Sequence, residues 1–412
     1  MLDTHDGQVG CYKQGKCGLD GVFLGCLGVF LGCLGLLVVC VLDGCFMQSG
    51  SLTGVANSSA VVSASDRAWV DDAIRKIDGD FTRTADTHLI TLDLPTPLAI
   101  DGIDVYFKDE STHPTGSLKH RLARSLLLYA LCNGWVGPKT TLVEASSGST
   151  AISEAYFARL VGLPFIAVVP ESTAKSKCDL IQFYDGQVHF VKHASEVYEA
   201  ARELARQTTG HYMDQFTYAE RATDWRGNNN IAESVFAQMV HERYSVPSWV
   251  VVGAGTGGTS ATFGRFVRYK RLPTQVAVVD PEHSVFHPYF QTGDATLTSP
   301  HSSRVEGIGR PRVEPSFIRQ VVSDVLPIED LESIAAMRLM SQWLGRRVGP
   351  STGTNLVGVM QLMRRMQIRG EQGSLVSLIC DGGDRYAHLY DDAWVDEHIG
   401  RGLSQRLQAL AN

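Results

Sequence analysis

From about residue 91 onward, short apolar runs alternate with longer amphipathic stretches. Short runs rich in β-branched residues are typical of buried strands, whereas apolar residues that recur every three or four positions indicate helices. The apolar runs predict strands at Val105–Lys108, Thr141–Glu144, Phe165–Val169, Val188–Val191, Trp249–Val252, Gln275–Val279 and Val376–Cys380. The amphipathic stretches predict helices at Gly116–Leu131, Thr150–Val161, Ser172–Tyr184, Ser195–Gln207, Asn230–Tyr244, Thr259–Lys270, Asp330–Leu344 and Thr354–Met366. A further helix is predicted before residue 91, at Asp66–Asp80.

Strands that alternate with helices in this way form a parallel sheet with crossover helices, so the sequence predicts an α/β fold. In such folds, ligands bind beyond the carboxyl ends of the strands. The chain has 412 residues, which exceeds the size of one compact core and favours two domains.

The first 65 residues form a leader of different composition. Gly21–Leu42 is a run of 22 residues without a charge, long enough to cross a bilayer, and it holds one heptad twice, at Gly21–Leu27 and Gly28–Leu34. Three interpretations compete: a membrane anchor, a secretion signal, or upstream DNA translated from a wrongly chosen start, with Met47 the true first residue. The repeat favours the third, and membrane contact is expected only for a real anchor. Residues 48–65 are rich in Ser, Gly and Ala and are predicted to be disordered.

The composition of the whole chain is that of an ordinary globular protein, with 44% hydrophobic and 20% charged residues. The net charge is −7 and no basic tract is present, which argues against a nucleic-acid partner. Six of the nine cysteines lie in the first 45 residues, and the others are Cys132, Cys178 and Cys380. Without a Cys-x-x-Cys pair, the body of the chain is expected to be reduced, cytoplasmic and free of disulfides.

Lys119 stands at a position that is unusual for a surface lysine. It follows the predicted strand Val105–Lys108 and a Pro-Thr-Gly turn, and the apolar helical stretch Leu122–Leu131 comes after it. A lysine held at such a turn points into the space that the sheet encloses. Burial lowers the pKa of an amine and makes it a nucleophile toward aldehydes. A solvated lysine at a helix start is the alternative.

Two loops between a strand and a helix are suited to bind anions. Ser146–Thr150 combines small hydroxyl residues with a glycine, so its backbone N–H groups can bind a carboxylate or a phosphate. An ordinary helix cap is the alternative there. Gly253–Thr259 follows a strand and satisfies Gly-x-Gly-x-x-Gly, with Asp280 at the end of the next strand. Taken alone, this second pattern also predicts an NAD-dependent dehydrogenase.

Three further loops carry small or polar residues beside the predicted elements. They are Asp214–Phe216, Glu306–Pro311 and Gly349–Thr354. Each has an ordinary explanation alone, as a strand end, a flexible loop and a helix cap respectively. Several such loops in a fixed order are more specific than any one glycine loop.

In their order along the chain, the lysine and the five loops resemble the β-family of pyridoxal phosphate enzymes, which contains cysteine synthase, cystathionine β-synthase and threonine synthase. The resemblance covers about residues 91–390. Within the family, the chain most closely resembles bacterial L-cysteine desulfhydrases. The stretches that carry this are Lys108–Lys119, Tyr212–Thr217, Asp224–Asn230 and Gly307–Pro315.

The resemblance implies a two-domain fold type II enzyme, similar to the tryptophan synthase β-subunit, in which each domain is a mostly parallel sheet flanked by helices. The small domain with the lysine would span residues 113–215, the large domain 216–400, and a tail 401–412. Residues 66–112 would form an N-terminal helix and a crossing segment, packed on the large domain. Enzymes of this group are commonly dimers, so a homodimer is implied.

The resemblance also assigns roles to single residues. Lys119 would hold pyridoxal 5′-phosphate as an imine and act as the catalytic base. The other cofactor-binding residues would be Ser149, Gly255, Thr256, Gly257, Gly258, Thr259 and Ser351. The substrate carboxylate would be bound by Ser146, Ser147, Gly148, Thr150 and Gln215. No metal ion is expected.

The implied reaction is β-elimination on L-cysteine, which gives sulfide, pyruvate and ammonia. A β-replacement synthase would use the same residues, so O-acetylserine and cystathionine stay open as substrates. Cysteine synthases usually have asparagine where this chain has Ser149, which weakens a synthase assignment. Gly307–Arg310 is a candidate gate over the site. The remote alternatives are the NAD-dependent dehydrogenase and a non-catalytic scaffold, and Lys119 argues against the latter.

Overall fold

The computed structural model describes residues 63–411. The apolar segment Gly21–Leu42, Met47 and nearly all of the 1–65 leader lie outside the described residues. Among residues 63–411, no helix combines the length and the apolar character that a membrane crossing requires.

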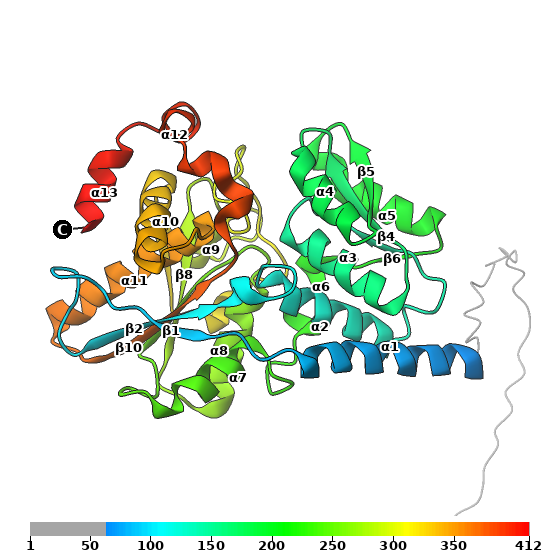
Figure 1. Cartoon of the computed structure of the whole chain (residues 1–412), viewed down its shortest axis with the longest axis horizontal. Helices are drawn as coiled ribbons and strands as arrows, with labels where there is room; N and C mark the ends of the chain where they lie inside the picture. The colour runs from blue at the N-terminus through cyan, green and yellow to red at the C-terminus, as the bar shows by residue number, and fades with distance from the viewer. Residues whose placement is uncertain (1–62, 412) are drawn as a thin grey trace, which may run out of the picture. The chain divides into compact units, whose positions relative to one another are not determined.

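The larger of two sheets has six strands in the order β1-β2-β10-β7-β8-β9 (Figure 1). β1 pairs antiparallel with β2, and the other neighbouring strands are parallel. Parallel sheets are buried on both faces, and accordingly every position of β10 is buried. The strands are β1 (Leu89–Thr91), β2 (Ile103–Asp109), β7 (Trp249–Gly253), β8 (Gln275–Pro281), β9 (Asp324–Ile328) and β10 (Gly373–Ile379).

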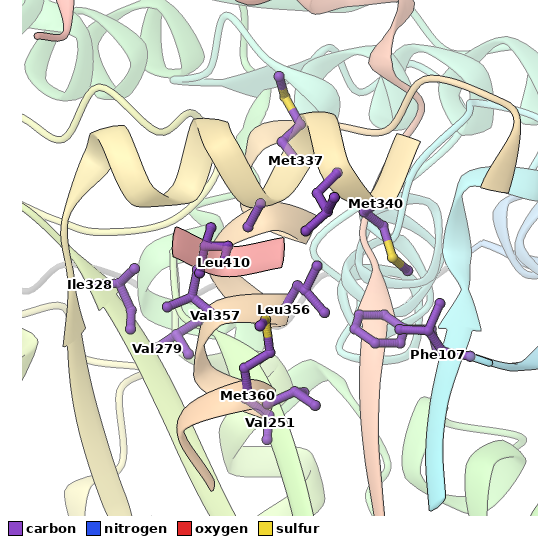
Figure 2. Packing of buried hydrophobic residues seen from close by; sticks show 14 of the residues in the cluster. Phe107, Val251, Val279, Ile328, Met337, Met340, Leu356, Val357, Met360 and Leu410 are labelled. Atoms are coloured by element: carbon purple, nitrogen blue, oxygen red, sulfur yellow. The ribbon is translucent and has the colours of Figure 1, made fainter. Parts of the chain in front are cut away.

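Helices cover both faces of the six-stranded sheet. On one face, Val357 and Met360 of α11 pack in one cluster with Val251 and Val279 of the sheet (Figure 2). The helices of that face are α10 (Asp330–Leu344) and α11 (Pro350–Arg369), with α12 (Asp392–His398) and α13 (Leu403–Ala411) beside them. A second cluster joins the opposite face to α7 (Ile231–Gln238), α8 (Gly258–Lys270) and α9 (Phe286–Thr292).

The smaller sheet is fully parallel, in the order β5-β4-β3-β6. Its strands are β3 (Leu142–Glu144), β4 (Phe165–Pro170), β5 (Gln187–Val191) and β6 (His211–Tyr212). The helices that pack in this part are α2 (Lys119–Cys132), α3 (Ser149–Val161), α4 (Lys175–Phe183), α5 (Val197–Gln207) and α6 (Gln215–Ala222). The predicted α/β architecture with parallel sheets is therefore confirmed.

The expected position of the N-terminal helix is wrong. α1 (Ala64–Arg83) packs on α2 and α3 beside the smaller sheet, and not on the large domain. The reason is its apolar stripe, in which Trp69, Ala73 and Ile77 recur every four residues and join the hydrophobic cluster of those helices. The crossing segment, in contrast, contributes strands β1 and β2 to the larger sheet. Residues 401–412, expected as a tail, include helix α13.

Candidate active site

A cavity of about 890 Å³ lies between the two sheets. The loops that follow β3, β7 and β10 line it, so it sits at the carboxyl ends of the strands, as expected for a parallel α/β fold. Its volume is that of a site for a cofactor-sized ligand. The cavity brings together Lys119, Ser146, Ser147, Gly148, Ser149, Thr150, Gln215, Gly255, Thr256, Gly257, Thr259 and Ser351. Gly258 faces a smaller pocket behind the loop instead.

Lys119 is the first residue of α2 and lines this cavity. The turn before it is tied to the end of β10, because the Leu118 N–H donates to the Cys380 carbonyl at 2.8 Å. The Lys119 N–H donates to Ser117 Oγ at 3.1 Å, which fixes the start of the helix. Burial lowers the pKa of the Lys119 amine, and the positive charge of Arg310 acts in the same direction. The side chain is thus prepared to act as a neutral amine.

The glycine loop between β7 and α8 forms a seat for an anion. Gly257 has a φ of +90°, and a Cβ there would lie 2.5 Å from the Phe317 Cα, so glycine is required on two counts. A Cβ on Gly255 would likewise meet the Gly307 carbonyl oxygen. The first turn of α8 leaves backbone N–H groups without a helical acceptor, and these favour a phosphate.

The loop between β3 and α3 is organised by hydrogen bonds that reach α6. Thr150 Oγ1 donates to Gln215 Oε1 at 2.8 Å, and the Gln215 N–H donates to Glu144 Oε2 at 3.1 Å. Glu144 is fully buried at the end of β3, and burial raises the pKa of its carboxyl to about 8, although the N–H groups of Gln215 and Ala145 oppose the shift. A protonated acid under the loop carries no negative charge that would repel an anionic ligand.

Residues 84–381 match the family described as pyridoxal-phosphate dependent enzyme. The chain belongs to this family. It is 59% identical to L-cysteine desulfhydrase Cds1 of Mycobacterium tuberculosis over 331 residues, which cover 80% of this chain and 90% of that protein. The predicted family resemblance is therefore confirmed.

Solved structures with low sequence identity share the fold of this pyridoxal-phosphate dependent enzyme. A hydrogen sulfide-producing enzyme from Fusobacterium nucleatum gives a TM-score of 0.68 at 21% identity, covering 81% of this chain and 96% of that one. O-ureido-L-serine synthase gives a TM-score of 0.64 at 24% identity, covering 78% and 96%. The match confirms the predicted fold type II architecture.

The residues around the cavity fit the cofactor of a pyridoxal-phosphate dependent enzyme. The glycine seat would hold the phosphate, and the Lys119 amine would hold the aldehyde carbon. Ser351, the second residue of α11, is buried and contacts the Cys380 thiol, and its neutral hydroxyl would be the group offered to the ring nitrogen. Burial raises the pKa of Cys380 to about 12, so this wall of the cavity carries no thiolate at neutral pH.

Asp280 is not placed to bind the ribose of NAD, as it would be in a dehydrogenase. Its carboxylate is buried, accepts the N–H of His287 at 2.7 Å and does not line the cavity. The Asp280 carboxylate therefore stabilises the turn after β8. In a pyridoxal-phosphate dependent enzyme, a bound phosphate would account for the glycine pattern without a ribose-binding acid.

Some polar side chains of the cavity were not found from the sequence. Arg385 Nη1 donates to Ser149 Oγ at 2.8 Å, and its Nη2 donates to the Thr115 carbonyl. Asp381 accepts the Tyr386 hydroxyl at 2.6 Å, and burial raises the pKa of Asp381 to about 6. One signal was available, because these residues follow the last predicted strand at the binding edge of the sheet. Tyr198 offered none, since it lies in an ordinary amphipathic helix.

Proposed function

We propose that this chain catalyses β-elimination on L-cysteine and releases sulfide, pyruvate and ammonia. The observation that carries the proposal is the 59% identity to an L-cysteine desulfhydrase over nine-tenths of that protein. Supporting it, Lys119, the glycine seat and the hydroxyl loop line one cavity in this pyridoxal-phosphate dependent enzyme.

The roles follow from the chemistry of each side chain. Pyridoxal 5′-phosphate, when bound, supplies the electron withdrawal that makes the α-proton of an amino acid acidic. Lys119 Nζ accepts that proton, because burial lowers the pKa of the amine and so favours its neutral form. The N–H groups and hydroxyls of Ser146–Thr150, with Gln215, bind the substrate carboxylate and orient the α-carbon.

The cofactor-binding set is proposed as Lys119, Ser149, Gly255, Thr256, Gly257, Gly258, Thr259 and Ser351. Ser351 offers the ring nitrogen a hydroxyl and not a carboxylate, which leaves the ring close to neutral. A weak electron sink favours elimination over transamination. Gly258 contributes through the backbone of the helix start, since it lies on the rear side of the seat.

The substrate and the reaction are tested together. Purified protein supplied with pyridoxal phosphate is incubated with L-cysteine alone, and sulfide, pyruvate and ammonia are measured. Equal amounts of the three products are expected. A second thiol or O-acetylserine is then added to detect a replacement product. Replacement without pyruvate from cysteine alone would make the enzyme a β-replacement synthase and overturn the proposal.

Three broader features are proposed with the function. The family resemblance supports a homodimer, and sedimentation velocity would test it. The cysteine usage supports a cytoplasmic location, which fractionation with an antibody would test. The two sheets support the division into a small domain and a large domain, which limited proteolysis would test at the segments that join them.

A further inference from the structure

A cluster of aromatic and charged side chains forms one wall of the cavity. Tyr198 of α5 lies edge-on to Phe216 of α6, with ring centroids 5.6 Å apart. The guanidinium of Arg310 lies 4.3 Å from the Phe216 ring centroid, and that of Arg312 lies 4.2 Å from the Tyr198 ring centroid. All four residues line the cavity that contains Lys119. The reaction proposed above gives none of them a contact with the substrate.

The cluster carries an excess of positive charge. Arg310 Nε and Arg312 Nε both donate to Glu314 Oε1, at 2.8 and 3.2 Å. Glu314 is buried and is the acidic partner that the two arginines share. Two guanidinium groups therefore face one carboxylate, and a positive field extends into the cavity. The same field reaches Lys119, since the charge of Arg310 lowers the pKa of its amine.

The hydroxyl of Tyr198 is available as a hydrogen-bond donor. Its oxygen accepts a hydrogen bond from Arg310 Nη2, which orients the phenol. Within residues 63–411 the Tyr198 hydroxyl donates to no acceptor, although it stands at the cavity wall. Burial raises the pKa of Tyr198, so the group stays protonated at neutral pH. A ligand atom that gains negative charge in the cavity would therefore meet an O–H donor backed by a cation.

We propose that Tyr198 and Arg310 form the subsite for the sulfur that leaves the substrate. This inference rests on the proposed cysteine elimination and deepens it. The Cβ–S bond breaks, its electron pair goes to sulfur, and sulfur departs as hydrosulfide. The α-proton passes to Lys119 Nζ, and the electron pair of the broken Cα–H bond forms the Cα=Cβ double bond. Tyr198 donates a hydrogen bond to the developing hydrosulfide, and Arg310 balances its charge without being consumed.

The test compares two leaving groups in Tyr198→Phe. Hydrosulfide is a much stronger base than chloride, the group that leaves from β-chloro-L-alanine, so its departure gains more from a hydrogen-bond donor. Removing one donor at a developing anion costs on the order of 10²-fold. We therefore expect kcat/KM for L-cysteine to fall roughly 10- to 100-fold, while that for β-chloro-L-alanine changes less than about threefold. Arg310→Gln should also lose more activity on L-cysteine than on β-chloro-L-alanine, together with a smaller loss common to both, because Arg310 also lowers the pKa of Lys119.

The controls separate this role from a structural one. Tyr218→Phe removes a hydroxyl from α6 outside the cavity and should leave both substrates unchanged. The visible absorption of the bound cofactor and the Tm show whether each variant is folded and loaded. An equal loss on both substrates, or no loss on either, would overturn the subsite. If the wild-type protein releases pyruvate from β-chloro-L-alanine but no sulfide from cysteine, the proposed function fails instead.

Discussion

Lys119 is the residue on which the chemistry of the site depends. Its backbone N–H already bonds to Ser117, so changing the side chain leaves the start of α2 intact. Lys119→Ala is expected to lower sulfide release by about 10³-fold or more, since a base is lost together with the group that holds the cofactor. The rate of sulfide release measures the loss of activity, and the visible absorption band of the bound cofactor measures the loss of its attachment. Lys175→Ala, at an exposed position of α4, is the matched control. Activity that survives in Lys119→Ala would exclude this lysine as the base.

Glu154 has a buried carboxyl that should make stability depend on pH. Within the described residues neither of its carboxyl oxygens has a hydrogen-bond partner. Burial, and then the neighbouring Glu144, raises the pKa of Glu154 well above its usual 4.5. The folded chain therefore keeps a proton that the unfolded chain loses. This contribution to the free energy of unfolding is complete below pH 4.5 and is lost as pH rises through the folded pKa.

Glu154→Gln should flatten the pH dependence. The amide cannot ionise, so the fall in the free energy of unfolding as pH rises above 4.5 should become shallower than in the wild type. Denaturant unfolding at several pH values measures it. Glu199→Gln, an exposed position on α5, should keep the wild-type slope. Identical slopes for Glu154→Gln and the wild type would show that Glu154 does not retain its proton.

Single residues differ in how far the sequence can reveal them. Lys119 could be found because a strand, a tight turn and a helix surround it within about twenty positions of the chain. The charged partners of Ser149 and Tyr198 could not, since Arg385 and Arg310 are more than a hundred positions away along the chain. Such pairs depend on how the two sheets face each other, and no local pattern encodes that.

At the level of elements, the loop from β7 to α8 depends on backbone shape. Gly257→Ala would force a side chain into left-handed backbone and against Phe317. We expect weaker cofactor binding, by roughly tenfold or more, because the N–H groups at the start of α8 would shift from the phosphate. Titration of the stripped protein with pyridoxal phosphate measures it. Gly137→Ala, which has open space and an ordinary φ, should bind as the wild type does. Unchanged affinity in Gly257→Ala would remove this loop from the phosphate site.

The strands and helices themselves were largely predictable, and the misses have local causes. The predicted strands were recovered because β-branched runs in a parallel sheet are apolar on both faces. β6 has two residues, too few for any pattern. β9 lies at a sheet edge and contains Pro327, which normally argues against a strand. α11 begins at Pro350, before the predicted Thr354, because proline is favoured in the first turn of a helix.

At the scale of the whole molecule, ion pairs and hydrogen bonds across the cavity join the elements around the two sheets. Lys177 of α4 pairs with Glu306 at 2.8 Å, joining the smaller sheet's helices to the loop that precedes Gly307–Arg310. Arg310 meets Tyr198, and Arg385 meets Ser149, in the same way. The Lys177–Glu306 pair is partly exposed, and such pairs contribute only about 0–1 kcal/mol each. A ligand that contacts both walls should therefore add substantially to the cohesion of the two parts.

Removal of pyridoxal phosphate tests this expectation. A ligand that binds only the folded chain stabilises it by RT ln(1 + [L]/Kd), about 2.7 kcal/mol at a hundredfold excess over Kd. Stripping the cofactor with hydroxylamine should therefore lower the Tm by several degrees, and adding it back should restore the Tm. Inorganic phosphate should restore only part, because it fills the glycine seat without reaching Lys119. If the Tm does not change when the cofactor is removed, the bound cofactor does not help to hold the two walls of the cavity together.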